Sequence, residues 1–326
     1  YLGLLRHGQG WMYDRFVDIL PHVFSESSQV VIVELSAHEP PPDEADWILL
    51  LETIQSLGAR QVVFSGLPAG VGPAFIAHVL DYDNIILGRT PLRQEIDDQY
   101  LTLDNWPSRL DAAGVPFGLV VPPRAEFGIS RSAQTRLPHG MAWLPSLAMA
   151  VAHANDPDRP LPREQEFLVN FNDGRDRLPK VSAGRVLASA LIPEIVAGRT
   201  VLVGMAPAAG IPGIHTPDTD GQEPLSLLEF QGYALDTLLA GKTIHTTGPL
   251  TLLSLLLISA MASLFIYQWL DVRSGGWFTL VMLAIYWVSG WGQLHYLHLW
   301  PPVFELSLGQ VLLYLSLIHI SEPTRP

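Results

Sequence analysis

The feature that most constrains this chain is an apolar run at residues 249–270, PLTLLSLLLISAMASLFIYQWL. It carries no charge over about twenty residues, the length that a helix needs to cross the hydrocarbon core of a bilayer. Leu, Ile and Phe each favour insertion by about 0.3 to 0.6 kcal/mol at a helix centre, so we expect the run to insert. The alternative is a buried helix of a large soluble domain, and it is disfavoured because two more apolar runs follow.

Those runs lie at residues 277–294 and 303–318, and the polar turn DVRSGG precedes the first of them. Aromatic residues typical of a membrane interface lie near the ends of the runs: Trp269, Trp277, Trp291, Tyr296 and Trp300. The sequence therefore predicts a transmembrane region of three helices over residues 248–318. Polar residues are almost absent from these runs, whereas a transporter would spread them through its spans.

The orientation depends on one basic residue. Arg273 is the only one in the two connections between the runs, so the positive-inside rule places its turn in the cytoplasm and residues 1–247 outside. Glu305 lies near the start of the third run, and we expect its carboxylate to reach the membrane interface. The chain is therefore predicted to be a multi-pass protein of the lipid bilayer.

Charge is concentrated in the first 248 residues. Of the chain's 19 basic and 32 acidic residues, 17 and 29 lie there, which gives this part a net charge of −12. An acidic domain without clusters of Lys and Arg is a poor partner for nucleic acid, because phosphate contacts need concentrated positive charge. The absence of cysteine excludes disulfides, zinc–thiolate sites and thiol nucleophiles.

The first soluble segment has the pattern of a strand, a helix and a second strand. Residues 29–35 (QVVIVEL) form a β-branched run typical of a strand buried on both faces. Asp43 can cap a following helix with an apolar face, which Gly58 ends, and residues 61–64 form the next strand. Such a unit has parallel strands, so the predicted class is α/β with a mainly parallel central sheet and flanking helices.

The rest of residues 1–247 continues this pattern as one domain. A helix in residues 1–26 is expected to cover the domain's edge, and the proline-rich segment 156–162 to be a surface loop. Further strands are expected at residues 84–88, 117–121, 166–171 and 199–205, and further helices at 141–153, 183–191 and 226–240. Residues 207–223 are expected to be a polar loop.

Ligands of parallel sheets bind outside the carboxyl ends of the strands. In this chain the predicted ends carry Glu34, Ser65 and Asn172, and the loop after the last strand carries Asp218. These four are the candidate ligand-binding residues. They define a location rather than a chemistry.

Signals of catalysis are weak. Ser65 lies in FSGLPAG, which lacks the G-x-S-x-G turn that exposes a nucleophile, so a packed turn serine is favoured over a hydrolase nucleophile. The segment around Asp218 and Asp220 matches only a fragment of a calcium loop, and a solvated loop is favoured there. We therefore expect no catalytic residue, metal or cofactor in the chain. A membrane-tethered periplasmic hydrolase is the alternative interpretation.

Residues 198–244 carry a series of motifs that resemble a known family. GRTVLVGMAPAAG, HTPDTDG and LEFQGYALDTLLAGKTI, directly before three apolar runs, resemble the type-two CHASE domain, a sensory module of bacterial receptors. QVVIVEL, LLLETIQSLGARQVVFSG and FLVNF resemble its earlier elements, so the resemblance covers about residues 11–320. The chain departs from the family at Glu34, Ser65 and Gly213, where relatives commonly carry Asp.

The resemblance implies an extracytoplasmic sensor in the bacterial inner membrane that receives an unidentified small-molecule or periplasmic signal. In the family the third span leads to a cytoplasmic kinase or nucleotide cyclase, so we expect a truncated receptor, without an enzymatic activity of its own. We also expect a homodimer. Residues 319–326 resemble translated adapter sequence and are expected to be a non-native tail.

Overall fold

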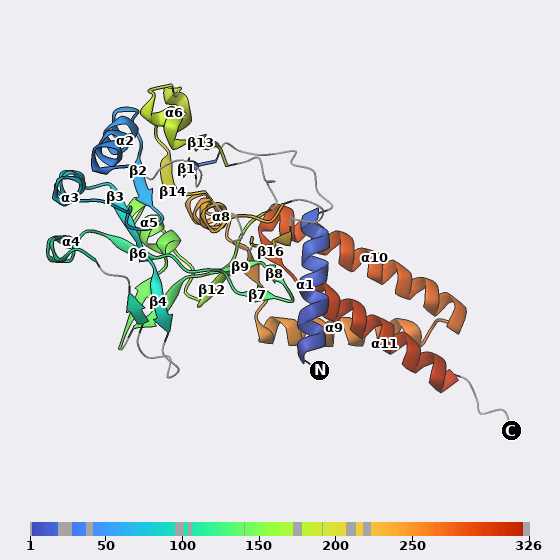
Figure 1. Cartoon of the computed structure of the whole chain (residues 1–326). Helices are drawn as coiled ribbons and strands as arrows, with labels where there is room; N and C mark the ends of the chain where they lie inside the picture. Colours follow the sequence, from blue (N-terminus) through green and yellow to red (C-terminus); the bar gives the residue numbers. More distant parts are fainter. Residues whose placement is uncertain are drawn as a thin grey trace. The chain divides into compact units, whose positions relative to one another are not determined.

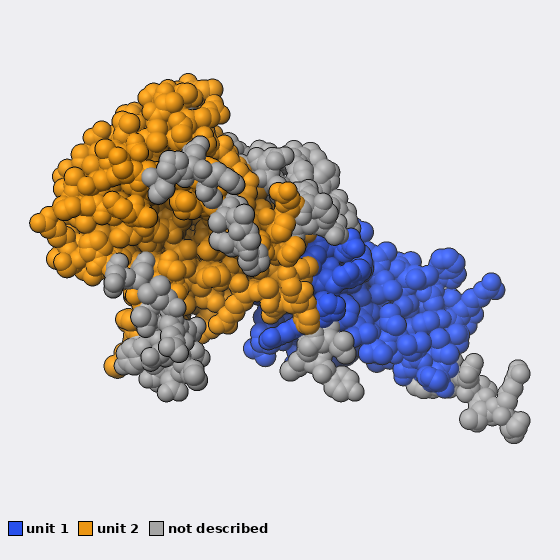
Figure 2. Space-filling model, viewed as in Figure 1, with its two compact units in different colours: residues 1–21, 244–326 blue, residues 22–243 orange. Residues whose placement is uncertain are grey.

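The structure is a computed structural model of residues 1–326 and has two compact units. Unit 1 comprises residues 1–21 and 244–326, and unit 2 comprises residues 22–243; Figure 2 colours them separately. The structure describes residues 2–18, 28–36, 42–94, 101–103, 106–139, 141–171, 178–190, 192–206, 213–217 and 223–321. Each unit is described by itself.

Unit 2 is built on a six-stranded sheet in the order β13-β1-β14-β2-β3-β6 (Figure 1). The strands are β1 (Val30–Leu35), β2 (Gln61–Phe64), β3 (Ile85–Arg89), β6 (Phe117–Leu119), β13 (Lys180–Ser182) and β14 (Thr200–Met205). Every pairing between neighbours is parallel. The prediction of an α/β fold with a mainly parallel central sheet is confirmed.

Helices cover both faces of this sheet. One face packs its apolar side chains against α2 (Glu44–Ser56), α3 (Pro73–Leu80), α4 (Ser108–Ala113), α6 (Ala183–Leu187) and α7 (Pro193–Val196). The other face is covered by α5 (Leu147–Asn155) and α8 (Leu227–Leu239), which also contact each other (Figure 1). Because side chains alternate along a strand, Val31, Val33 and Leu35 of β1 join the first core, and the residues between them face α8.

Helix α2 begins at the cap that the sequence predicts, Asp43. Asp43 accepts a hydrogen bond from the backbone N–H of Asp46 at 2.9 Å, and the Asp46 carboxylate accepts one from the Asp43 N–H at 3.3 Å. This reciprocal capping box satisfies two backbone donors that the first turn of a helix leaves unpaired. Gly58 follows the helix with a φ of 78°, a conformation that glycine adopts without strain.

Four two-stranded sheets in unit 2 lie outside the central sheet. Their pairs are β4 (Pro91–Gln94) with β5 (Leu101–Leu103), β7 (Ala125–Glu126) with β8 (Ile129–Ser130), β9 (Ser132–Gln134) with β12 (Glu166–Leu168), and β10 (Arg136–His139) with β11 (Ala142–Pro145). They form much of the chain between β3 and β13, where the sequence predicts only one strand, one helix and a loop before residue 166.

One prediction in this region is confirmed in part, and another is wrong. Residues 166–168 form a strand, β12, but it pairs antiparallel with β9, and the place beside β1 in the central sheet is taken by β13. Residues 141–153 are not one helix, since β11 precedes α5. Pro145 explains the break: the residue before a proline is driven toward extended backbone, so the helix begins only after Ser146.

Helix α8 is the most buried helix of unit 2, with 11 of its 13 residues buried. The Asp236 carboxylate accepts hydrogen bonds from Ser28 Oγ at 2.7 Å and from the Gln29 N–H at 3.0 Å, which joins α8 to the start of β1. Arg159 donates to the carbonyl oxygens of Leu238 and Leu239 in the same last turn of α8. A cation at this position also complements the negative end of the helix dipole.

Unit 1 contains α1 (Leu2–Asp18), α9 (Pro249–Tyr267), α10 (Val272–Leu297) and α11 (Val303–Ser321). A short parallel pair, β15 (His245–Thr246) and β16 (Leu299–Trp300), lies before α9 and before α11. All three apolar runs are therefore helical, and α11 extends past its predicted end. The assignment of residues 319–326 to a non-native tail stays a prediction, and residues 322–326 lie outside the described residues.

Helix α1 belongs to unit 1, so the expectation that it covers an edge of the α/β domain is wrong. Gly8 faces the ring of Phe304 so closely that an added Cβ would lie 2.3 Å from it. The Phe16 ring contacts the rings of Trp287 and Trp300, each with centroids 5.5 Å apart. Aromatic side chains of α1 therefore pack against those of α10 and β16 within this unit.

One helix of unit 1, α9, is long and apolar enough to cross a membrane, and residues Val303–His319 form a shorter apolar helix. Large apolar side chains are exposed along α9, as at Ile258, which is 65% exposed. The length, the composition and the exposed side chains of α9 support association of the chain with a membrane in general terms. Three spans, their orientation and the domain limits at residues 247 and 318 stay predictions.

Polar side chains join the three apolar helices from inside. Ser263 Oγ donates to Gln310 Oε1 at 2.7 Å, Gln310 Nε2 donates to the Tyr267 hydroxyl at 2.9 Å, and this hydroxyl lies 2.6 Å from Thr279 Oγ1. All four side chains are buried. The three runs contain few polar residues, and four of them form one network.

Candidate ligand-binding site

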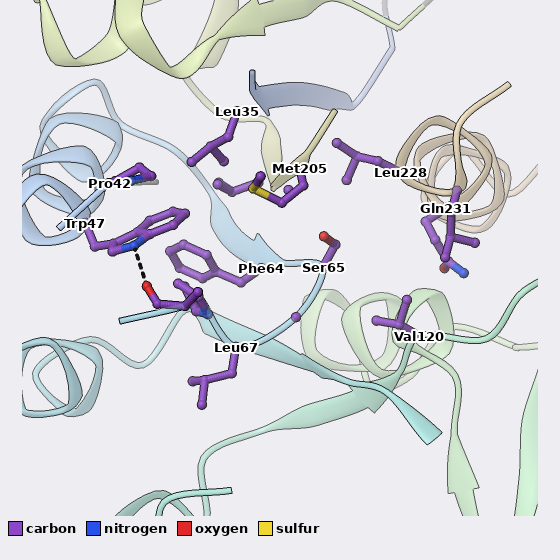
Figure 3. A pocket seen from close by; sticks show the side chains of 16 residues that line it. Leu35, Pro42, Trp47, Phe64, Ser65, Leu67, Val120, Met205, Leu228 and Gln231 are labelled. Atoms are coloured by element: carbon purple, nitrogen blue, oxygen red, sulfur yellow. Dashed lines mark hydrogen bonds between the residues drawn. The ribbon is translucent and has the colours of Figure 1, made fainter. Parts of the chain in front are cut away.

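A pocket of about 370 Å³ lies at the carboxyl ends of β1, β14 and β2, beside the first turn of α8 (Figure 3). Its labelled lining residues are Leu35, Pro42, Trp47, Phe64, Ser65, Leu67, Val120, Met205, Leu228 and Gln231. The chain leaves β1 and β2 toward helices on one face of the sheet, and it leaves β14 toward α8 on the other face. Such a divergence opens a crevice in which ligands of parallel sheets bind.

A row of residues crosses three neighbouring strands at this edge, and Gly204 and Ser65 of the row line the pocket. Glu34 pairs with Gly204 in the register of β1 and β14, and Ser65 lies one residue beyond the pair formed by Val203 and Phe64. A Cβ added to Gly204 would lie 2.2 Å from Ser65 Oγ and 2.6 Å from a methyl group of Leu228. Glycine is therefore required here, because it lets α8 and the end of β2 approach β14 closely.

An aromatic wall lies on the side of α2. The rings of Trp47 and Phe64 meet edge to face, with centroids 6.1 Å apart. Trp47 Nε1 donates to the carbonyl oxygen of Ala69 at 3.3 Å, drawn as the dashed line in Figure 3. This bond ties the loop after β2 to α2, so the wall is held from two elements.

Two polar side chains reach the pocket. Gln231 Nε2 donates to the carbonyl oxygen of Val121 at 2.9 Å, which fixes the orientation of the amide. Among the described residues, neither Gln231 Oε1 nor Ser65 Oγ has a hydrogen-bond partner. No His, Asp, Glu, Lys or Arg is among the described lining residues, so none of them could take a proton from Ser65.

A charged cluster lies beside the pocket but does not line it. Lys180 of β13 contacts the Glu229 carboxylate, which also accepts a hydrogen bond from the Ser226 N–H at 2.6 Å in the capping box of α8. Burial by itself would raise the pKa of Glu229, but the bonds from Lys180 and Ser226 outweigh it and lower the pKa. Burial raises the pKa of Glu34, although Lys180 opposes the shift.

The structure brings two of the four candidate residues together. Glu34 and Ser65 lie in the same row, separated by one strand, and of these two only Ser65 lines the pocket. Asn172 and Asp218 lie outside the described residues. The reason for expecting Asn172 at this edge fails, because the strand before it, β12, is not in the central sheet. That any of the four binds a ligand stays a prediction.

The sequence analysis missed Trp47, Gly204 and Gln231. Gln231 offers a signal, since it is a polar residue within the apolar sequence of α8. Gly204 near the end of an apolar strand offers another, because such a glycine often marks a close approach. Among the described residues, no three His, Asp or Glu side chains gather in a way that could hold a metal ion.

Comparison of the chain with protein-family models, with curated proteins and with solved structures finds no match. The resemblance to the type-two CHASE domain therefore depends on the sequence motifs alone.

Proposed function

We propose that the chain is the sensory and transmembrane input module of a bacterial receptor, with an extracytoplasmic α/β domain of the type-two CHASE class and three transmembrane helices. A signal binds at the carboxyl ends of the parallel strands, and α8 transmits its effect toward the membrane. No observation on the described residues favours the alternative of a tethered hydrolase, because the pocket beside Ser65 offers no described base.

The observation that carries the proposal is the position of α8 in the chain. Its first turn lines the pocket through Leu227, Leu228 and Gln231, and only residues 240–248 separate its end from α9. A connection of this length reaches at most about 30 Å when fully extended, so it limits how far the ends of the two helices can move apart. A large movement of α8 would therefore be passed to α9.

The burial of α8 supports its action as one body. Asp236 and Arg159 hold its last turn through hydrogen bonds, and 11 of its 13 residues are buried, so the helix has few ways to bend locally. A ligand that favours one of two positions of α8 by about 1 to 3 kcal/mol would suffice for regulation. The exposed apolar side chains of α9 support the membrane half of the proposal.

The test joins a nucleotide cyclase domain to the chain after Leu317 and uses Gly204→Ala in place of the unidentified signal. The added methyl group must displace Ser65 or Leu228, so it disturbs the start of α8 directly. We expect it to change cyclase output several-fold. A flexible Gly/Ser insertion after Gly241 should abolish this dependence, and the same insertion after the exposed turn residue Gly114 should preserve it.

Orientation is measured in the same fusion. Thiols introduced by Asp156→Cys and Ser274→Cys are unique in this cysteine-free chain. A membrane-impermeant reagent applied to cells should label the first and not the second. Labelling of Ser274→Cys alone, or an output that responds to Gly204→Ala regardless of the Gly241 insertion, would contradict the proposal.

A further inference from the structure

We infer that the pocket beside Ser65 takes an uncharged, mainly apolar small molecule with one hydroxyl or N–H group, which donates to Gln231. This inference deepens the proposed function, since it names the chemistry of the signal at the same site. It is argued from the size of the pocket, its walls and its two polar groups.

The size of the pocket selects a small ligand. Its volume of about 370 Å³ lies near the lower end of the range of small-molecule sites, which is about 300 to 1,000 Å³. The aromatic wall and the first turn of α8 hold two of its sides through residues that are themselves packed, such as Trp47 and Leu228, which are both 4% exposed. A compact molecule fits this space, and a folded peptide does not.

The walls select against charge. Apolar side chains dominate the lining, and the described lining contains no charged residue. An ion entering the pocket would lose its hydration without gaining a partner of opposite charge among the described lining residues, which costs far more than the transfer of an uncharged group. The neighbouring Lys180 offers no compensation to an anion, because it already contacts Glu229.

The polar side chains of Gln231 and Ser65 determine which hydrogen-bonding group the ligand must carry. The Gln231 amide already donates to Val121, so its oxygen remains to accept a bond. Ser65 can donate or accept. Figure 3 shows Trp47 and Phe64 toward one end of the pocket and Gln231 toward the other, with Ser65 between them. A ligand with an apolar ring and one hydroxyl group would therefore place the ring against the aromatic pair and the hydroxyl near Ser65 and Gln231.

The experiment measures protection of a thiol at the rim of the pocket. Met205 lines the pocket and is 53% exposed, so Met205→Cys introduces a unique reactive group while Ser65 and Gln231 stay intact. The full chain in nanodiscs is alkylated with N-ethylmaleimide in the presence of para-ethylphenol, para-ethylbenzoate or glucose. Ser56→Cys, at an exposed position of α2, is the control for effects of the probes on the reagent or the bilayer.

We expect para-ethylphenol to slow alkylation of Met205→Cys at least fivefold at saturation, and the charged and the sugar probes to slow it less than twofold. Alkylation of Ser56→Cys should not change. Adding Gln231→Leu should raise the phenol concentration for half-protection about tenfold, because the acceptor is lost. The same addition should leave weaker protection by ethylbenzene, which has no hydroxyl group, unchanged.

Each outcome decides a separate point. Equal protection by para-ethylbenzoate would overturn the uncharged ligand, and an effect of Gln231→Leu on ethylbenzene equal to that on the phenol would overturn the role of its oxygen. Absence of protection by every probe would overturn the pocket as a ligand site. Protection together with a cyclase output that ignores Gly204→Ala would remove the proposed receptor function and leave the pocket chemistry standing.

Discussion

The two units of this protein differ most in the side chains that they expose. In unit 2 the strands bury Val, Ile and Leu, and most of the charged side chains lie at the surface. In unit 1 the apolar helices expose large hydrophobic side chains and bury Ser263, Thr279 and Gln310, which are at most 5% exposed. The strands of unit 2 thus hide their apolar side chains, whereas the apolar helices of unit 1 leave many of theirs exposed.

The contrast teaches which driving force builds each unit. Water drives apolar side chains together, so a unit that folds in water hides them. In lipid there is no such force between helices, and close packing with interhelical hydrogen bonds holds them together. The network between α9, α10 and α11 is of this second kind, which supports the proposal that they lie in a membrane.

The largest effect that tests this difference between the units is expected when a charge is placed on the exposed face of α9. Ile258 lies at the middle of α9 and is 65% exposed. If this surface faces lipid, Ile258→Arg should disfavour insertion by about 3 to 4 kcal/mol, the difference between the two side chains at a helix centre. The measurement is the membrane-inserted fraction of the chain after expression.

The matched control is Leu49→Arg in α2 of unit 2, where the leucine is 46% exposed. An exposed substitution in water should change stability by no more than about 0.5 kcal/mol. Equal and small effects of the two substitutions would show that α9 faces water, and the comparison between the units would fail.

The second prediction concerns the polar groups that unit 2 does bury. Asp236→Ala leaves the Gln29 N–H without its side-chain acceptor, and it leaves Ser28 Oγ with only the Val30 carbonyl oxygen to donate to. We expect the free energy of unfolding of unit 2 to fall by about 2 to 4 kcal/mol, because a buried donor without a partner keeps its desolvation penalty. Urea unfolding followed by circular dichroism measures the change.

Asp236→Asn is the matched variant for this prediction, since it retains one carbonyl oxygen as an acceptor. It should cost less than half as much as Asp236→Ala. If both substitutions cost under about 0.5 kcal/mol, then α8 is not held to β1 by this carboxylate, and its proposed movement as one body would lose its main support.

The predictable parts of the fold have local signals. The β-branched run of β1, the cap at Asp43 and the apolar face of α2 lie within one segment, so the unit from β1 to β2 is read directly from the sequence. Strand β13 is three residues long, and its position depends on docking beside β1. Such a strand has no periodic pattern of its own, so the sequence predicts a strand at residues 166–171 and none at β13.

The residues of the site also fall into those that the sequence predicts and those that it does not. Glu34 and Ser65 are found because the ends of parallel strands share one edge of a sheet, whatever the strand order. Trp47 and Gln231 approach the same pocket from helices on opposite faces of the sheet. Their meeting depends on tertiary packing, which neither local sequence contains.

The smallest loss of stability is expected for a substitution in the buried polar network of unit 1. Gln310→Leu removes the link between Ser263 of α9 and the Tyr267 hydroxyl and leaves both groups in an apolar interior. In water-soluble cores such a loss is expensive, but double-mutant cycles in membrane helices average about 0.6 kcal/mol and reach about 1.7. We therefore expect a loss of about 0.5 to 1.5 kcal/mol, below that of Asp236→Ala.

The loss expected for Gln310→Leu is smaller than that for Asp236→Ala for a physical reason, which the experiment tests. Helices that separate within a bilayer still satisfy their backbone, and freed polar side chains find other partners, so the reference state is less costly than an unfolded chain in water. Steric trapping in bicelles measures the change, and Ser254→Ala, which loses only a bond to the Thr251 carbonyl of its own helix, is the control. A loss above about 3 kcal/mol for Gln310→Leu would mean that the helices behave like a core in water, and unit 1 would then be a soluble bundle with an incompletely covered apolar surface.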